Sequence, residues 1–197
     1  MAVFRLKIDG RWEPSDFIDT LEAVETLYYM ALDKPFYHWA WLEDYRYFAG
    51  PEFHLSPYDS YLDTMNRAML ARARRVIPGG GRLFVKRIEF ASPGGMDFAG
   101  VGQAADAVER LVGRLIDFFA DRRLRRERDK QAAIETEIRD QNLASLKIDN
   151  ARKLLELHRD FPDAEHLIAL AVRGQDKLAD RIAQGMITGT GSDTDEK

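Results

Sequence analysis

The stretch 91-ASPGGMDFAGVGQAADAVERL-111 decides the fold, because it joins a tight turn, a short strand and the start of a helix. Ser92-Pro93-Gly94-Gly95 suits a β-turn, since proline presets φ at the second position and glycine accepts positive φ at the third. Met96 and Phe98 then alternate with other residues, as expected for a return strand. The stretch therefore predicts a β-hairpin that leads directly into a helix.

The spacing Gly100-x-Gly102-x-x-Ala105 within this stretch resembles the start of a dinucleotide site. Such a site needs a strand-to-helix turn inside a parallel βαβ unit, with an acidic residue about twenty positions further on. Here the strand belongs to a hairpin, and the following residues have a helical pattern. We therefore interpret Gly100 and Gly102 as positions where the return strand bends closely into the helix, and we expect no cofactor.

Alternating and helical patterns of apolar residues predict that the N-terminal part, residues 1–120, is an α+β domain. We expect a small, mostly antiparallel sheet of three strands, covered by helices. A change in the parity of the apolar positions indicates either a β-bulge near Lys86–Arg87 or a strand covered on both faces. The expected strands are 3–9, 82–91 and 95–99, and the covering helices are 16–32, 59–76 and the first half of 103–160.

The helical pattern that begins at Gln103 continues for an unusually long way, to about residue 160. A helix of this length either projects from the domain or folds back as a hairpin near residues 120–130. We expect residues 121–187 to form a helical extension, a candidate coiled coil, followed by a disordered tail over 188–197. Self-association or a protein partner would shield the apolar side chains of the extension. These candidate interaction residues are Ile134, Ile138, Ile148, Leu154 and Leu155.

An aromatic-rich insertion over 33–58 separates the first two helices. Nine of the 21 aromatic residues of the chain lie between 36 and 58. Such a cluster is either part of the core or the wall of a ligand pocket. The candidate pocket residues are His38, Trp39, Trp41, Tyr45 and His54.

Charge is concentrated in residues 121–130, which contain six basic and three acidic side chains. On a helix these side chains can pair with one another at i,i+3 and i,i+4. The alternative is contact with nucleic-acid phosphates, although no aromatic residues are interleaved to stack on bases. The residues that would make it are Arg122, Arg123, Arg125, Arg126 and Arg128.

Composition excludes several classes of protein. The chain has 197 residues, a formal net charge of −4 and no cysteine. Disulfides, thiolate metal sites and cysteine nucleophiles are therefore excluded, and the composition fits a reducing cytoplasm. We expect no signal peptide, membrane span, metal site or catalytic residues, because their sequence patterns are missing.

The hairpin region 87-RIEFASPGGMDFAGVG-102, with a strand and capped helix before it and a long helix after it, resembles a group of uncharacterised bacterial proteins. These have a small α+β domain ahead of a helical tail. Some are thought to act as adaptors beside effector genes, including those of defence systems. The resemblance covers residues 1–120 and implies an interaction or assembly function without catalytic residues. The alternatives are a small-molecule binder or enzyme that uses the aromatic cluster, and nucleic-acid contact through 122–128.

Overall fold

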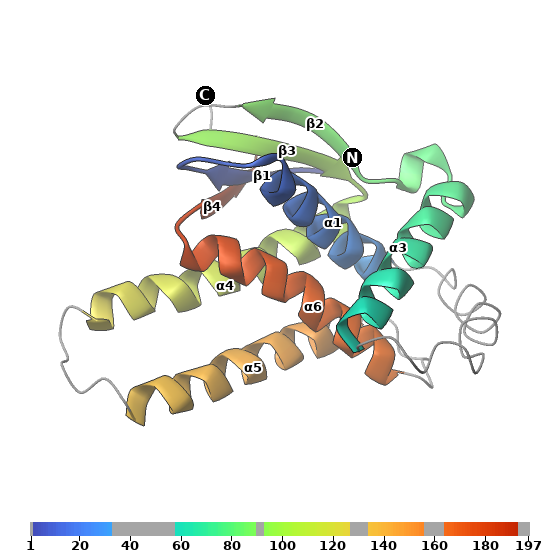
Figure 1. Cartoon of the computed structure of the whole chain (residues 1–197). Helices are drawn as coiled ribbons and strands as arrows, with labels where there is room; N and C mark the ends of the chain where they lie inside the picture. Colours follow the sequence, from blue (N-terminus) through green and yellow to red (C-terminus); the bar gives the residue numbers. More distant parts are fainter. Residues whose placement is uncertain (1, 33–57, 90–92, 127–133, 156–163, 193–197) are drawn as a thin grey trace.

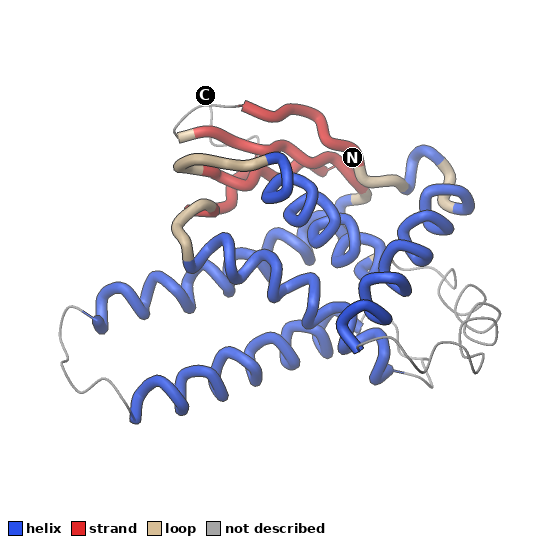
Figure 2. The backbone as a smooth tube through the Cα atoms, in the orientation of Figure 1, coloured by secondary structure: helices blue, strands red, loops and turns tan. Residues whose placement is uncertain are grey.

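The described residues form one four-stranded antiparallel sheet with helices packed on one of its faces (Figures 1 and 2). The computed structural model describes residues 2–32, 58–89, 93–126, 134–155 and 164–192. The elements are β1 (Ala2–Ile8), α1 (Pro14–Ala31), α3 (Tyr58–Val76), the 3-10 turn η2 (Gly79–Gly81), β2 (Phe84–Glu89), β3 (Gly94–Gly100), α4 (Gly102–Arg126), α5 (Ile134–Leu155), α6 (Ala164–Ala183) and β4 (Ile187–Ser192).

The sheet confirms the predicted hairpin, the antiparallel pairing and the bulge. The strand order is β2-β3-β1-β4, and every neighbouring pair is antiparallel. β2 and β3 form the expected hairpin, with a register shift between Val85 and Arg87. The change in apolar parity thus arose from a bulge at the predicted position. The prediction that Gly94 and Gly95 form the turn of the hairpin is wrong, because both belong to β3 and neither has a positive φ.

The prediction of three strands and a disordered tail over 188–197 is wrong for residues 188–192, because these belong to a fourth strand. β4 pairs with the edge of β1 that β3 leaves open, and Ile187 is buried beneath it. The sequence ITGTGS lacks a clear alternation of apolar residues, so its strand state depends on the hydrogen bonds that β1 offers. Residues 193–197 lie outside the described part.

The helical layer is built around α1, α4 and α6. α4 lies under β1, β3 and β4, while α1 packs against both α4 and α6. One contiguous core joins the inner side chains of the sheet, such as Phe4 and Phe98, to those of the helices, such as Leu27 and Val108. The layer therefore fixes β1, β3 and the β4 edge relative to α1.

The long helix expected over 103–160 is two helices, because α4 ends at Arg126 and α5 begins at Ile134. α5 runs back past α4 and packs mainly against α6 (Figure 1). A buried polar chain ties the three helices together: Arg114 Nη1 donates to Asn150 Oδ1 (2.8 Å), and Asn150 Nδ2 donates to Gln175 Oε1 (3.1 Å). The extension therefore folds back, which was the second alternative for this segment.

The opposite face of the sheet carries no helix in the described ranges (Figure 1). Its central polar side chains are paired with each other. Arg5 Nε donates to Asp97 Oδ1 at 2.6 Å, and Arg5 Nη2 donates to Asp97 Oδ2 at 3.0 Å. The Arg5 side chain also covers Gly95, where an added Cβ would lie 3.2 Å from Arg5 Cδ.

The glycine at the end of β3 has a packing function. A Cβ at Gly100 would lie 2.5 Å from the ring of the buried Tyr28. The Tyr28 hydroxyl accepts a hydrogen bond from the Val101 amide (2.8 Å) and donates to the Gly81 carbonyl (3.0 Å). A tyrosine thus occupies the place at the strand-to-helix turn where a dinucleotide site would need space and free amides.

We expect Gly100→Ala to destabilise the protein by about 1–3 kcal/mol, because the added methyl group overpacks the Tyr28 ring. Urea unfolding followed by far-ultraviolet circular dichroism measures this change. The matched control is Gly113→Ala in α4, where the nearest atom to the added Cβ is Thr190 Oγ1 at 3.9 Å. That variant should be stabilised by about 0.5–1 kcal/mol, since alanine is the better helix former. Equal effects of both substitutions would contradict the packing role of Gly100.

Candidate interaction surfaces

Charged side chains hold α6 and α3 onto α1. The acidic residues of α1 recur every three positions, and basic residues of α6 and α3 pair with them. Arg181 bridges Asp16 (2.8 Å) and Asp19 (3.3 Å), while Lys177 bridges Asp19 and Glu22, both at 3.2 Å. These groups are engaged within the fold, so we assign them a structural role.

A small cleft opens between α1, α3 and α6, and its polar lining is paired as well. Arg173 makes two hydrogen bonds of 2.8 Å to Asp63, and Thr26 donates to Asn66 at 2.8 Å. The Arg173 guanidinium lowers the pKa of the Asp63 carboxyl. The enclosed space holds about one water molecule, which is too little for an organic ligand.

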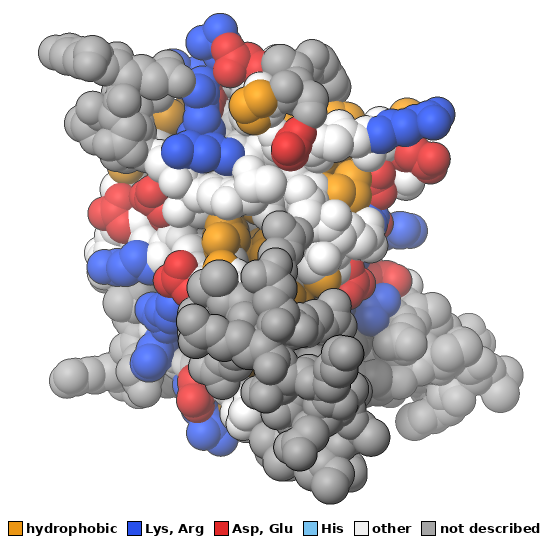
Figure 3. Space-filling model, turned by 90° about the vertical axis from the view of Figure 1, so that its left-hand side faces the viewer, with side chains coloured by type: hydrophobic (Ala, Val, Ile, Leu, Met, Phe, Trp, Pro, Cys, Tyr) orange, Lys and Arg blue, Asp and Glu red, His pale blue; other side chains and the backbone are white. Residues whose placement is uncertain are grey.

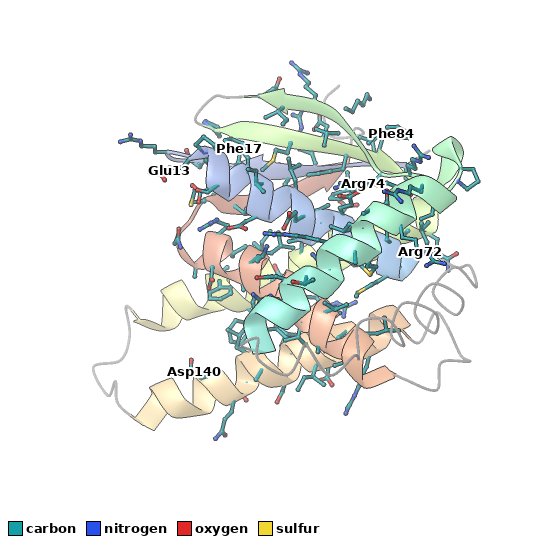
Figure 4. All side chains as sticks on the ribbon, turned by 45° about the vertical axis from the view of Figure 1, so that its right-hand side comes forward. Glu13, Phe17, Arg72, Arg74, Phe84 and Asp140 are labelled. Atoms are coloured by element: carbon teal, nitrogen blue, oxygen red, sulfur yellow. The ribbon has the colours of Figure 1, made fainter. Side chains whose placement is uncertain are left out.

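The most prominent feature is a helical arm, which we define as residues 120–126 of α4 and 134–142 of α5. Both segments extend beyond the sheet and beyond α6, and their ends lie apart in Figures 1 and 4. Beyond the arm, Leu143 and Leu146 of α5 pack against the core cluster. The labelled Asp140 marks the α5 half of the arm in Figure 4 and is exposed.

The structure separates the five predicted interaction residues along α5. Ile134 and Ile138 lie in the arm, whereas Leu154 and Leu155 lie at the other end of the helix, about 30 Å away at 1.5 Å per residue. The side chains of these four lie outside the described part. Ile148 lies between the two ends and is 36% exposed.

The other two sets of predicted site residues lie wholly or partly outside the described part. The candidate pocket residues His38, Trp39, Trp41, Tyr45 and His54 lie outside the described residues, as does Arg128. For the candidate phosphate contacts the backbone is described, at the end of α4, but the side chains are not. These are Arg122, Arg123, Arg125 and Arg126.

A second surface, which the sequence analysis missed, lies at the opposite end of the molecule. We call it the basic corner, and it consists of the end of α3, η2 and the start of β2. Residues 64–89 contain seven basic side chains and one acidic side chain, although the whole chain is acidic. The basic residues are spread over α3, β2 and the connection between them rather than one run, so a sum over the whole segment is needed to reveal them. Figure 4 places Arg72 and Arg74 on α3 and Phe84 on the neighbouring strand.

Two tyrosines at the end of α1 hold the basic corner in place. Tyr28 binds the Gly81 carbonyl, and the Leu83 backbone hydrogen-bonds to Tyr29. Burial, followed by the nearby Glu25 carboxylate, raises the pKa of Tyr29 to about 12. Arg74 Nε in turn donates a hydrogen bond of 2.9 Å to the Glu25 carboxylate. This bond raises the pKa of Arg74.

The side of the molecule seen in Figure 3 has a different character. Lys and Arg side chains are interspersed there with Asp and Glu, and the apolar spots are small and separate. A surface of mixed sign does not produce a strong local field. The basic excess of residues 64–89 contrasts with this side, although Arg74 and Arg87 of the corner pair with Glu25 and Glu89.

Comparisons with protein-family models, curated proteins and solved structures gave no match. Within the described residues, no group of three or more His, Asp or Glu side chains is arranged to hold a metal ion. None of the described helices has the length and apolar character needed to cross a bilayer. The fold and its surfaces are therefore the basis for assigning a function.

The raised pKa of Tyr29 predicts a loss of stability at alkaline pH. The folded state keeps the Tyr29 proton up to about pH 12, whereas an unfolded tyrosine releases it near 10.0, so stability falls as pH rises between these values. We expect wild type to lose roughly 2 kcal/mol more than Tyr29→Phe between pH 10 and 12. Urea unfolding of both proteins at several pH values measures the difference. Parallel curves for the two proteins would contradict the prediction.

Proposed function

We propose that this protein is a non-enzymatic interaction module that self-associates through its helical arm. The observation that carries the proposal is the arrangement of the arm. Its two helical segments project past the rest of the fold, and their ends lie apart (Figures 1 and 4). Isolated helical segments of this length are marginal in water unless an apolar face is covered.

The sequence of the arm supports a second copy as the covering partner. Ile134 and Ile138 are four residues apart and therefore share one face of α5. The last turns of α4 add Leu124 between basic residues. Two arms that associate about a twofold axis would form a four-helix bundle and bury these side chains against each other.

The described interior supports a non-enzymatic role. Four of its buried polar side chains, Thr26, Asp97, Asn150 and Gln175, hydrogen-bond to other groups of the same fold. The cleft between α1, α3 and α6 is filled by paired side chains. Surfaces thus provide the better candidate for function than cavities.

The test is the absolute mass of the full-length protein by size exclusion with light scattering, at low and high salt. We expect a dimer or larger assembly that persists at high salt, because apolar side chains make the contact. Ile138→Asp should weaken association by about tenfold or more, since it places a charge in the apolar contact. The unfolding midpoint measured at a concentration where both proteins are monomeric should change little.

The matched control is Ile18→Asp, which makes the same change at the most exposed large apolar residue of the described part, on α1 (57% exposed). It should leave the mass unchanged. A wild-type protein that stays monomeric at high concentration would refute self-association. An assembly that survives Ile138→Asp but is lost in Ile18→Asp would move the interface to α1.

A further inference from the structure

The basic corner has the composition of a docking surface for an anionic partner. Its segment carries a net charge of +6 between residues 64 and 89, within a chain whose total is −4. Arg75 on α3 and Lys86 and Arg87 on β2 are exposed. Concentrated charge of one sign attracts partners of the opposite sign and speeds their encounter.

Apolar side chains accompany this charge. Phe84 and Val85 are each 45% exposed and Val101 is 39% exposed. They lie at one end of the sheet, since Phe84 pairs with Ala99 and Val85 pairs with Phe98, close to the end of β3. Phe84 and Val85 point to opposite faces of the sheet, so a segment that contacts both must pass over the β2 edge. Apolar residues surrounded by a polar rim are typical of protein-binding sites.

The surface is also preorganised. Arg82 Nε donates to the Ile77 carbonyl at 2.9 Å and so ties the turn after α3 to the start of β2. The Tyr28 hydroxyl joins Gly81 on one side to Val101 on the other. A partner therefore meets a fixed arrangement of anchors and does not have to order them on binding.

The occupant is not a second copy of this chain, because β2 is built to reject one. Two antiparallel β2 edges would bring Lys86 and Arg87 of both copies together, and the bulge at this position disrupts straight pairing. Charged residues and bulges on an edge strand prevent homotypic pairing of this kind. The same charges favour a segment with acidic side chains.

A protein segment fits the corner better than a nucleic acid does. Single-stranded nucleic acids are bound on several aromatic side chains, one for each stacked base. Among the exposed large apolar residues of the described part, Phe84 is aromatic and the other four are Ile or Val. We therefore propose that the basic corner binds an acidic protein segment whose Leu or Phe side chains contact Phe84, Val85 and Val101.

This proposal is independent of the helical arm and is tested with the full-length protein. The probe is a fluorescently labelled peptide in which Glu and Asp alternate with Leu and Phe, and its binding is followed by anisotropy. We expect saturable binding that weakens with salt. Arg75→Glu combined with Lys86→Glu should raise the Kd about tenfold or more, because both changes reverse charge at the site. Phe84→Ser should raise it about fivefold by removing an anchor.

Two matched variants control for net charge and for apolar loss. Arg110→Glu with Lys153→Glu makes the same charge change at exposed positions of α4 and α5, and Ile18→Ser removes an exposed apolar residue of α1. Both should leave the Kd within about twofold of wild type. Circular dichroism checks that every variant is folded.

Three results would overturn the proposal. The first is no binding of the peptide at millimolar concentration, and the second is equal weakening by the control variants. The third is tighter binding of a mixed-sequence single-stranded RNA, or of vesicles containing phosphatidylserine, that is lost in the corner variants. That result would assign the corner to nucleic acid or to a membrane surface.

Discussion

The hydroxyl group of Tyr28 is the contact on which the arrangement of the sheet and helices depends. It lies between the Gly81 carbonyl and the Val101 amide, so one side chain of α1 fixes the approach to β2 and the exit from β3. A buried hydroxyl without partners would cost free energy, and here both its donor and its acceptor are used. Only glycine at position 100 leaves room for the ring. The bond thus links the hairpin, the start of α4 and the end of α1.

α1 is the element that other parts of the chain share. Its apolar side packs with the sheet and α4, while its acidic residues pair with basic residues of α6 and α3. Gly174 allows α6 to approach α1, since a Cβ there would already touch Leu27 Cγ at 3.4 Å. Because α6 leads directly into β4, the docking of α6 also delivers the fourth strand to the edge of β1.

The two proposed contact surfaces lie at opposite ends of the molecule. The helical arm projects from one end of the helical layer, and the basic corner lies where α3 meets β2 (Figure 1). Partners bound at the two surfaces would not obstruct each other. A self-associated arm that presents several basic corners would bind a multivalent acidic partner with higher avidity than one corner alone. This geometry suits an adaptor.

The sequence by itself determined the local elements, because turn chemistry and periodicity are properties of neighbouring residues. The antiparallel hairpin of β2 and β3, the bulge near Lys86 and the helices on either side of them followed from those signals, although Gly94 and Gly95 lie in β3 and not in its turn. Tertiary structure alone decided that residues 187–192 form a strand, since that state depends on the open edge of β1. It also decided that the helix after Gln103 divides and returns, because the Arg114, Asn150 and Gln175 side chains join only once three helices meet. The basic excess of residues 64–89 is present in the sequence, whereas the tertiary structure brings the end of α3 and the start of β2 together at one corner.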